Sequence, residues 1–429
     1  MGRVFNTKWL ALAGVAIALL LVVGLLNWSN LFAPKGRDKA TTYTLQILGN
    51  ANEDGTIDEH DIEYLREIIA GKRPKTSLAD ANNDGVIDEK DIKQVKKLIG
   101  EEAEELFVLD TAGRIVKIKL PVKKVVAFST SAPAGALRIL GKGDMIIAIN
   151  GMITGDPFYP EHQGKPAVGW PEPNYEAIVN LNPDLVIASA NPAYAFEVVE
   201  KMKPFGIAVV QLDLGGKPEK YLEELRTLSW IMGGKERAEE FIKWSRSYVD
   251  FVRQRLSQLK PEERKSVYYE FIGDYQVMGR ADGIIQGAGG VNVFAELFEG
   301  DYLEHRNFTV DAEEVIRKNP DVIIKDPHIG FKWSGYARGV LKHMEELKKE
   351  LMARPGWSEL KAVKNGNVYI ISREVGNERT LSIVLLSKLL YPDLFQDVDE
   401  SAVLKEFLER FHGRKYEDYA VYIYPLSKK

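Results

Sequence analysis

The segment at 234–260 reads GKERAEEFIKWSRSYVDFVRQRLSQLK and lies between the pair Gly233-Gly234 and Pro261. Its apolar residues recur at steps of three and four, which places them on one face of a helix. At about 1.5 Å per residue this helix would be about 40 Å long, the span of a small domain. The apolar residues are Ala238, Phe241, Ile242, Tyr248, Val249, Val252, Leu256 and Leu259.

Two similar stretches of sequence flank this helix. YEAIV at 175–179 comes before NPDLVI at 182–187, and AEEVI at 312–316 comes before NPDVII at 319–324. Around both copies, short β-branched runs alternate with helical segments, which is typical of parallel sheets covered by helices. We therefore predict an α/β fold in which two doubly wound lobes are joined by the long helix, with a cleft between them. The expected strands are 125–128, 146–149, 185–187, 209–210, 267–271, 322–324 and 368–371, and the expected helices include 134–140, 193–203, 381–390 and 402–411.

Composition places the chain among folded proteins with more than one domain. It has 429 residues, of which 45% are hydrophobic and 28% charged, and its net charge is −5 with both signs interspersed. This length predicts two or three domains, and the charge does not suggest a nucleic-acid site. The absence of cysteine excludes disulfides, thiolate metal sites, a cysteine nucleophile and a lipidated N-terminal cysteine. Abundant lysine, glutamate and arginine without cysteine is also a feature of thermophilic proteins.

An apolar run of 18 residues, Trp9–Leu26, follows Arg3 and Lys8 near the N-terminus. A helix of that length reaches about 27 Å, close to the thickness of about 30 Å of a bilayer core. We expect residues 1–33 to be a retained membrane anchor, because NWSN at 27–30 is a poor cleavage context; a cleaved secretory signal is the alternative. In both cases the flanking charges place the rest of the chain outside the cytoplasm.

Two acidic loops repeat at an offset of 30 residues. NANEDGTIDEHD at 50–61 matches DANNDGVIDEKD at 80–91, and each loop runs into a short helix. Oxygen side chains fall at loop positions 1, 3, 5, 9 and 12, glycine occupies position 6, and position 7 offers its backbone carbonyl, which is the spacing of a calcium loop. Loop 2 has four carboxylates and loop 1 has three, so we expect weaker calcium binding by loop 1. The predicted ligands are Asn50, Asn52, Asp54, Thr56, Asp58 and Asp61 in loop 1, and Asp80, Asn82, Asp84, Val86, Asp88 and Asp91 in loop 2.

The paired loops, with aspartate rather than glutamate at position 12 and no full helix before loop 1, resemble a dockerin module over residues 43–100. The resemblance implies a small all-α, EF-hand-type domain that folds around two Ca²⁺ ions and docks onto a cohesin domain of another protein. In dockerins, loop positions 10 and 11 help to choose that partner. Here these positions are Glu59 and His60 in loop 1, and Glu89 and Lys90 in loop 2. A calcium buffer or sensor without a protein partner is the alternative.

Several further motifs accompany the paired phrases and the single joining helix. They are an Asp110-x-x-Gly113-Arg114 turn before the first strand, Val125-Val126 and Ser129 in and after that strand, and a Gly289-Gly290-x-Asn292 turn. Together these features resemble periplasmic-type binding proteins for iron-siderophores and cobalamin, over residues 107–424. The resemblance implies the substrate-binding component of an ABC importer, with an ABC permease and its ATPase as partners. The two lobes would be residues 107–232 and 261–429, joined by residues 233–260.

In that family, one surface glutamate on each lobe contacts an arginine pocket of the permease, and it lies seven residues before the Asn-Pro-Asp proline. The matching positions here are Glu176, before Pro183, and Glu313, before Pro320. Surface carboxylates by themselves indicate only solubility, so this prediction depends on the matched spacing. Two separated negative charges orient a weakly bound surface through steering and register. The long helix would fix their separation, and any hinge should lie at Gly233-Gly234.

We expect the ligand at the carboxyl ends of the strands, where the loops of both lobes converge. Aromatic rings there would contact a large chelate, and arginines would bind its carboxylates or oxyanions. Any single aromatic is more often a packing residue, so the cluster between His328 and Arg338 and the strand-end Arg373 are the stronger candidates. The candidate ligand residues are Ser129, Ser131, Tyr159, Trp170, Arg280, His328, Phe331, Trp333, Tyr336, Arg338 and Arg373.

Motifs of the common hydrolases and nucleotide-binding enzymes are missing, including Gly-x-Ser-x-Gly, His-Glu-x-x-His and the Walker A loop. The six histidines do not pair at zinc-like spacing, which favours a carrier of a metal chelate over a carrier of bare Zn²⁺ or Mn²⁺. We therefore predict a non-enzymatic, membrane-anchored binding protein at the cell surface that captures a ferric siderophore-type complex. The alternatives are a cobalamin, haem or oxyanion carrier of the same fold, and a non-transport scaffold component of a cohesin–dockerin assembly.

Overall fold

The contacts of the computed structural model divide the chain into two units. One comprises Met1–Thr42 and Lys260–Glu263, of which the described part is Lys260–Glu263, with a 3-10 turn at Pro261–Glu263. The other comprises Tyr43–Leu259 and Arg264–Lys429, and it carries every feature discussed below. The structure describes residues 44–128, 131–170, 172–190, 197–215, 218–298, 306–328 and 330–425.

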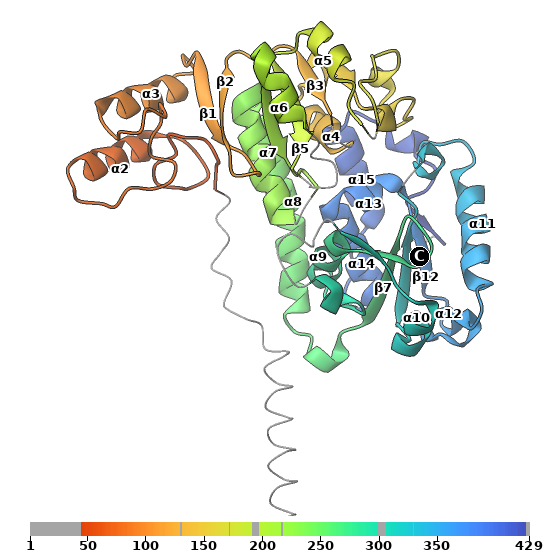
Figure 1. Cartoon of the computed structure of the whole chain (residues 1–429). Coiled ribbons are helices and arrows are strands. Elements are labelled where there is room, and N and C mark those ends of the chain that lie inside the picture. The colour runs from red at the N-terminus through yellow and green to blue at the C-terminus, as the bar shows by residue number, and fades with distance from the viewer. Residues whose placement is uncertain are drawn as a thin grey trace, which may run out of the picture. The chain divides into compact units, whose positions relative to one another are not determined.

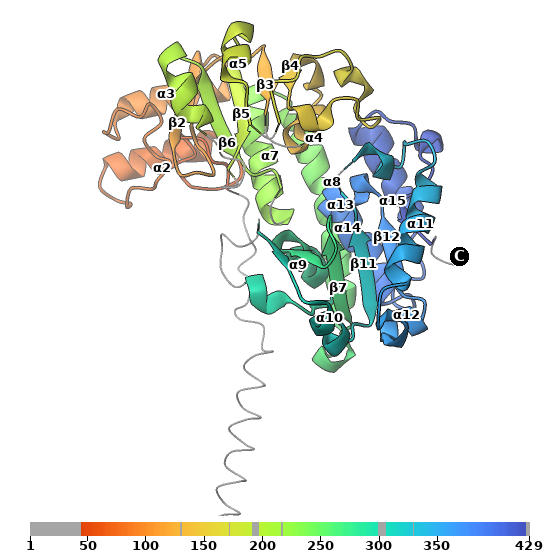
Figure 2. The ribbon, with the colours of Figure 1, turned by 45° about the vertical axis from the view of Figure 1, so that its right-hand side comes forward.

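The first lobe is built on a parallel sheet with the strand order β4-β3-β5-β6 (Figures 1 and 2). Residues of β3 and β5 are buried on both faces of the sheet, as the uninterrupted apolar runs of a helix-covered parallel sheet require. The strands are β3 (Val125–Ala127), β4 (Ile146–Ile149), β5 (Leu185–Ser189) and β6 (Ala208–Leu212), and the helices are α4 (Ala132–Ile139), α5 (Tyr175–Leu181), α6 (Val198–Met202) and α7 (Pro218–Met232).

The second lobe repeats this plan with the order β13-β12-β11-β7-β9, in which only the edge pairing of β13 with β12 is antiparallel. A short antiparallel pair, β8 with β10, forms a separate two-stranded sheet. The strands are β7 (Ser266–Phe271), β8 (Gln276–Met278), β9 (Val291–Asn292), β10 (Asn307–Thr309), β11 (Val322–Asp326), β12 (Val368–Ile371) and β13 (Ile423–Tyr424). The helices are α9 (Gly279–Gly287), α10 (Ala312–Lys318), α11 (Val340–Met352), α12 (Lys361–Lys364), α13 (Arg373–Asn377), α14 (Arg379–Leu390) and α15 (Glu400–Glu406), and α15 continues into a π-helical turn at Phe407–Phe411.

The expected joining helix forms as α8, Lys235–Leu256, which is one residue shorter at its start and four shorter at its end than predicted. Its fully buried Phe241 meets Tyr221 of α7 with a centroid distance of 6.1 Å and Phe411 of the C-terminal segment with 4.9 Å. Trp244, which the apolar pattern left out, is also buried and lies 5.3 Å from Phe411. The helix therefore packs against both the first lobe and the C-terminal helices.

The glycine pair before α8 is a tight turn pressed against the end of α4. Both residues have left-handed backbone angles, with φ +76° at Gly233 and +94° at Gly234. A Cβ atom on Gly234 would lie 2.6 Å from the carbonyl oxygen of Leu140. Only glycine tolerates both this backbone angle and this close approach to Leu140. The position that we expected to be a hinge is therefore packed tightly against the end of α4.

The two repeated phrases fold in the same way. Each forms a seven-residue helix, α5 or α10, and each helix ends in a left-handed asparagine, Asn182 with φ 45° and Asn319 with φ 44°. Asparagine tolerates this conformation, and the proline that follows cannot continue the helix. Glu176 and Glu313 consequently occupy the second position of matching helices, where both side chains are exposed.

The N-terminal module contains two helices, α2 (Glu59–Ile69) and α3 (Glu89–Ile99). Each helix follows an N-cap aspartate, Asp58 or Asp88, and starts with a capping box. The N-cap carboxylate accepts the backbone N–H of the residue three positions on, Asp61 or Asp91, whose own carboxylate accepts the backbone N–H of the N-cap residue. Most of the module's buried apolar residues belong to a core that also includes residues of the first lobe and of α8, whereas Leu48 and Leu78 pack with Phe107 in a smaller cluster.

Backbone hydrogen bonds tie this module to the first lobe through an antiparallel hairpin of β1 (Glu105–Leu109) and β2 (Ile115–Lys119). Leu48 donates its N–H to the carbonyl of Phe107 at 2.9 Å, and Leu109 donates to Gln46 at 3.0 Å. Gln46 in turn donates to the hydroxyl of Thr227 on α7 at 3.2 Å. The hairpin, which sequence reasoning did not anticipate, thus extends the lobe toward the module.

No helix in the described ranges is long and apolar enough to cross a membrane. The predicted anchor, Trp9–Leu26, lies outside the described residues.

Candidate functional site

A cavity lies between the two lobes at the carboxyl ends of their strands. Ser189 ends β5 and Phe271 ends β7, while Ser131, His328 and Arg373 follow β3, β11 and β12 within a few residues; all five line the cavity. This edge is where ligands bind in open parallel sheets. Its empty space, about 1240 Å³, includes the part that is open to solvent.

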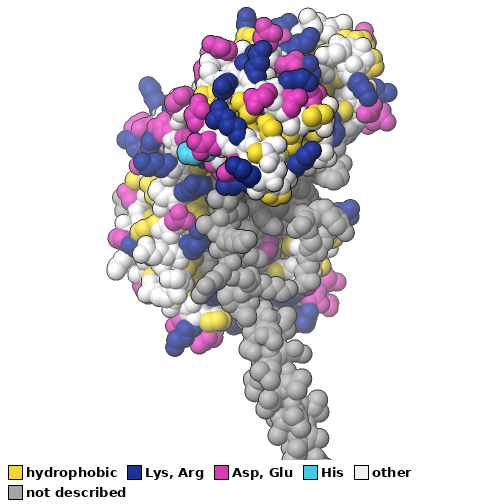
Figure 3. Space-filling model, turned by 90° about the vertical axis from the view of Figure 1, so that its left-hand side faces the viewer, with side chains coloured by type: hydrophobic (Ala, Val, Ile, Leu, Met, Phe, Trp, Pro, Cys, Tyr) yellow, Lys and Arg dark blue, Asp and Glu magenta, His cyan; other side chains and the backbone are white. Residues whose placement is uncertain are grey.

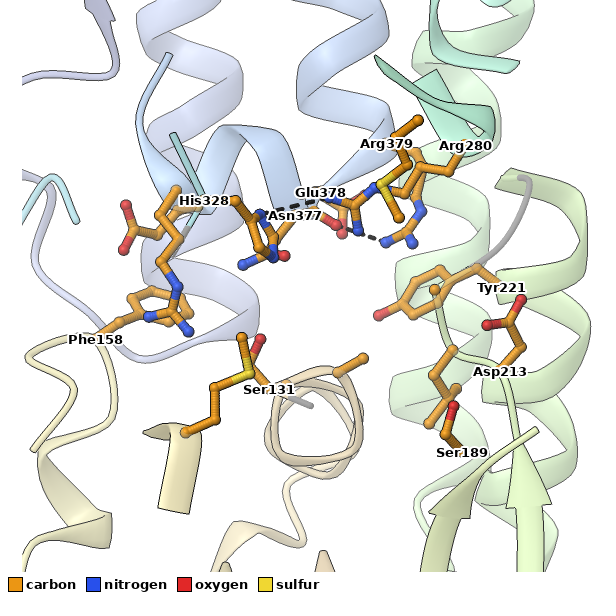
Figure 4. A pocket seen from close by; sticks show the side chains of 18 of the residues that line it. Ser131, Phe158, Ser189, Asp213, Tyr221, Arg280, His328, Asn377, Glu378 and Arg379 are labelled. Atoms are coloured by element: carbon orange, nitrogen blue, oxygen red, sulfur yellow. Dashed lines mark hydrogen bonds between the residues drawn. The ribbon is translucent and has the colours of Figure 1, made fainter. Parts of the chain in front are cut away.

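One wall of the cavity is cationic. The Nη2 atom of Arg280 lies 3.5 Å from Nδ1 of His328 and 3.9 Å from a carboxylate oxygen of Asp326, and its guanidinium is 5.2 Å from the ring centre of Phe271. Burial lowers the pKa of Arg280, and the charge of nearby Arg379 lowers it further. Figure 4 shows Arg280, His328 and Arg379 on one side of the cavity, facing residues of the first lobe. Two guanidinium groups that repel each other favour an anion between them.

His328 is a neutral member of this wall. Burial lowers its pKa well below the ordinary value, and the charges of Arg280, Arg373 and Arg379 act in the same direction. Asp326 is committed to local hydrogen bonds, because it accepts from the Tyr269 hydroxyl at 2.9 Å. Burial raises the pKa of Asp326, which further weakens its ability to neutralise the arginines.

Acidic groups also line the cavity, and Glu378 lies beside Arg379 (Figure 4). Asp213 and Glu378 line it, and burial raises the pKa of Glu378, which caps α14. Behind Asp213, the carboxylate of Glu224 accepts the N–H groups of Asp213 at 3.0 Å and Leu214 at 2.5 Å, and it also accepts the hydroxyl of Thr111. Burial raises the pKa of Glu224 to about 7. Glu224 therefore fixes the loop at 213–215 that faces the ligand space.

A buried ion pair closes part of the cleft between the lobes. Arg373 Nη1 donates to the carboxylate of Asp156 in the first lobe, and both side chains are almost completely inaccessible to solvent. Beside it, Phe158 of the first lobe stacks on Tyr336 of the second with centroids 6.0 Å apart. Arg373 lines the cavity as predicted, but Asp156 already neutralises its charge.

The structure brings six of the predicted ligand residues to this cavity and leaves others away from it. Trp333 is buried in the separate apolar core of the second lobe, and Tyr336 packs on Phe158. Phe331 lies 5.4 Å from the guanidinium of Arg373, and Arg338 is exposed; neither lines the cavity. Ser129 lies outside the described residues. The six that line the cavity are Ser131, Tyr159, Trp170, Arg280, His328 and Arg373.

Sequence reasoning missed several residues that line the cavity. Asp213 follows β6 directly and Phe271 is the last residue of β7, so the strand-end rule could have identified both. Arg379 stands in the first turn of a helix that we predicted to start at Leu381. Tyr221 comes from α7, which had no predicted role.

Both acidic loops have the oxygen donors that a calcium site needs. In loop 1, the Asp61 carboxylate accepts the N–H groups of Asn52 at 3.1 Å and Asp58 at 2.8 Å; in loop 2, Asp91 accepts from Asn82 at 3.2 Å and Asp88 at 2.8 Å. Among the described residues, no group of three or more histidine, aspartate or glutamate side chains gathers as it would around a metal ion. Instead the carboxylates are turned onto backbone N–H groups. The carboxylate, amide and carbonyl oxygens nevertheless fit a hard cation such as Ca²⁺.

Comparison with known protein families decides the class of the protein. A model of the periplasmic binding protein family matches residues 126–375, more than half of the chain. The chain belongs to the periplasmic binding protein family. A dockerin type I domain model matches residues 48–100, so both predicted resemblances are confirmed.

Known relatives of this binding protein agree with that assignment. An uncharacterised ABC transporter substrate-binding lipoprotein, YvrC of Bacillus subtilis, is 24% identical over 293 residues, which cover 67% of this chain and 86% of the relative. The solved structure of the Haemophilus influenzae molybdate-binding protein MolA with molybdate covers 72% of this chain and 98% of its own, with 18% identity and a TM-score of 0.60. The TroA-like periplasmic binding protein FepB of Veillonella parvula covers 74% and 98%, with 25% identity and a TM-score of 0.59. These relatives are solute-binding proteins, which agrees with a role other than catalysis.

Proposed function

We propose that this chain is the extracellular solute-binding component of an ABC importer and that it captures an anionic metal complex of the ferric siderophore type. The observation that carries the ligand class is the cationic wall of Arg280, His328 and Arg379. Burial and the charge of nearby Arg379 lower the pKa of Arg280, so an anion bound beside Arg280 would stabilise its charged form.

The other walls suit a large ligand. Phe158, Trp170, Tyr221 and Phe271 line the cavity and provide aromatic surface for the organic part of a chelate. Ferric siderophores combine such apolar or aromatic parts with negatively charged oxygen donors. The cavity offers a complementary surface to both properties.

A small oxyanion is the second candidate. Arg280 and Arg379 both line the cavity, so a compact tetrahedral anion can accept hydrogen bonds from their guanidinium groups. The MolA relative is described as a molybdate-binding protein. Cobalamin and haem remain candidates of the same fold, without a specific feature of the cavity that favours them.

Titration of the purified protein with defined compounds tests the ligand class. Ferric catecholate and hydroxamate complexes, cyanocobalamin, haem and molybdate are titrated by calorimetry, with native mass spectrometry to record what stays bound. We expect a ferric complex to bind and Arg280→Gln to weaken binding at least tenfold. Arg338→Gln is the matched control, because Arg338 is exposed and does not line the cavity. Binding of molybdate alone would select the oxyanion, and equal affinity of Arg280→Gln and the wild type would overturn the role of the cationic wall.

Docking to a permease is proposed for Glu176 and Glu313. The support is their equivalent, exposed positions on α5 and α10, two helices that each end in a left-handed asparagine and precede a buried parallel strand. Reversal of both charges to lysine should abolish uptake by cells while ligand affinity stays unchanged. Glu236→Lys, an exposed position on α8, is the control. A loss of ligand affinity in the double variant would show that the two glutamates contribute to ligand binding and not to docking.

The domain at 43–100 would tether the carrier to a cohesin-bearing partner once its loops hold calcium. Asn50, Asp54, Asp58 and Asp61 in loop 1 and the matching residues of loop 2 would supply the ligands, and Ca²⁺ would supply charge that allows the acidic loops to converge. Mixing the protein with purified type I cohesin domains, with and without a calcium chelator, tests this. Absence of a calcium-dependent complex would refute the tether. Location at the cell surface through residues 1–33 stays a prediction from the sequence.

A further inference from the structure

Both halves of the dockerin domain pack on one residue of the β1–β2 hairpin. Leu48 and Leu78 are equivalent in the two repeats, since each lies two residues before position 1 of its loop. These two leucines and Phe107 of β1 are buried together in one small apolar cluster. Gly49 also donates its N–H to the carbonyl of Leu78 at 2.6 Å, so the segments that lead into the two loops are joined. Phe107 therefore packs where both acidic loops begin.

The segment that leads into loop 1 also pairs with β1 through its backbone. Ile47 and Val108 form an antiparallel bridge, with backbone hydrogen bonds on either side of it. Leu45, at the start of this segment, donates its N–H to the carbonyl of Asp54 at 2.8 Å and accepts a side-chain N–H of Asn50 at 2.8 Å. Asn50 and Asp54 are predicted calcium ligands at positions 1 and 5 of loop 1. One short segment of chain thus connects these ligands to a strand of the hairpin.

The hairpin is anchored in the first lobe at its other end. Its turn begins at Asp110, whose carboxylate accepts the N–H of Gln211 in β6 at 3.1 Å, and Thr111 donates its N–H to the carbonyl of Gln211 at 3.1 Å. The segment before loop 1 contacts the lobe as well, because Gln46 donates its N–H to the hydroxyl of the buried Thr227 on α7 at 3.2 Å. The hairpin therefore belongs to the dockerin domain through its apolar cluster and to the first lobe through its turn.

The outer surface of the dockerin domain has a different character. Figure 3 shows basic and acidic side chains spread over the face of the molecule that carries this domain. Of the exposed residues of α2 and α3, all except His60 and Ile69 are charged. The domain consequently uses most of its apolar side chains in its interior and against the rest of the protein, and the hairpin is one of the surfaces that they contact.

We propose that calcium bound by the two loops stabilises the first lobe as well as the dockerin domain, because the β1–β2 hairpin is part of both. An ion that binds only the folded loops stabilises every segment that unfolds together with them. Coupling of this kind is reciprocal, so a weakened hairpin contact also weakens calcium binding. The proposal rests on the calcium binding that we propose for the loops. It makes the domain a calcium-dependent support of the solute-binding lobe in addition to a tether.

Hydrogen–deuterium exchange of the wild type tests the coupling without any substitution. The full-length protein in detergent is compared in a calcium chelator and in excess calcium chloride, with mass spectrometry of its peptides. We expect exchange of the β1 and β2 amides to slow at least fivefold in calcium, relative to the amides of α11 in the second lobe, because opening of the hairpin is linked to opening of the loops. Slowing that ends at residue 100 would overturn the coupling.

Substitutions in the hairpin test the reciprocal effect. Phe107→Ala removes the ring from the cluster, whereas Ile115→Ala, on β2 of the same hairpin, changes a side chain that is 48% exposed and is the matched control. Titration of calcium against a fluorescent chelator should give an affinity at least fivefold lower for Phe107→Ala and within twofold of the wild type for Ile115→Ala. Phe107→Leu keeps an apolar contact and should recover part of the loss. Circular dichroism in excess calcium confirms that each variant is folded.

Failure of the coupling and failure of calcium binding give different results. Equal calcium affinities of Phe107→Ala and the wild type would overturn the coupling and leave the calcium-dependent tether intact. Equal losses in Phe107→Ala and Ile115→Ala would show that the cluster has no special part in calcium binding, which also overturns the proposal. If the wild type binds no calcium in the titration, the tether and the coupling fall together.

Discussion

Glu224 makes the stability of this protein depend on pH in a direction that can be measured. Its carboxyl is 2% exposed, and burial raises its pKa from an ordinary 4.5 to about 7. The folded protein thus holds this proton more tightly than the unfolded chain. The stabilisation from the neutral carboxyl is fully present below about pH 4.5 and is lost as the pH rises through about 7. A shift of about 2.5 pKa units corresponds to about 3 kcal/mol.

The substitution Glu224→Gln removes the titration and keeps the shape of the side chain. We expect the free energy of unfolding of the variant, minus that of the wild type, to rise by about 2.5 kcal/mol between pH 5 and pH 8, because the wild type loses stability over this range and the variant does not. Urea denaturation followed by tryptophan fluorescence at several pH values measures this difference. Because other buried carboxyls titrate in both proteins, only the difference between them isolates Glu224.

Glu223→Gln on the same helix is the control, since Glu223 is half-buried and paired with Lys220 at 2.6 Å. Its unfolding free energy relative to the wild type should change little over this pH range. A pH-independent difference for Glu224→Gln would refute the raised pKa. A difference of the opposite sign would mean that the N–H groups of Asp213 and Leu214 hold the carboxylate in its charged form.

Three further predictions concern the packing that joins the lobes. Asp156→Asn leaves Arg373 buried without its counter-charge and should lower the free energy of unfolding by about 3 to 5 kcal/mol, measured by urea denaturation; recovery of part of this loss in a double variant with Arg373→Met is expected, and an additive loss would contradict the pairing. Phe241→Ala should cost about 3 to 5 kcal/mol, because the ring is fully buried between α7 and the C-terminal segment, and a cost below about 1 kcal/mol would contradict that packing. Gly234→Ala should lower the melting temperature, because its Cβ would meet the Leu140 carbonyl oxygen at 2.6 Å, whereas Gly141→Ala, whose Cβ would meet nothing within 4 Å, tests the cost of the left-handed angle alone.

Local sequence patterns were sufficient to predict the main elements of the fold. The period of the α8 segment, the two Asn-Pro-Asp phrases and the two acidic loops each depend on neighbours within about a dozen residues, and each appears in the structure as an element of the expected type. The helix-ending asparagines explain why the phrases repeat. A left-handed cap followed by proline depends only on the local backbone, so the end of each helix can be predicted from the sequence alone.

The sequence predicted only part of the candidate site, because the residues of the site come from distant parts of the chain and meet only in the folded protein. The strand-end rule pointed to Ser131, His328 and Arg373, but it could not show that Arg373 faces Asp156, 217 positions away. The aromatic cluster that includes Trp333 looked like a ligand loop in sequence. In the structure Trp333 is a core residue instead, since periodicity does not distinguish an aromatic ring that packs from one that contacts ligand.

The sequence by itself determined the elements of this protein: a helix between two α/β lobes, a duplicated calcium loop and two matched glutamates. Only the tertiary structure decided which of the predicted ligand residues line the cavity and which belong to the core. Lobe packing pairs Arg373 with Asp156, whereas it places Arg280 against His328 at the cavity. The reason is physical. Backbone geometry depends on adjacent residues, whereas exposure and charge balance depend on which distant surfaces are brought into contact.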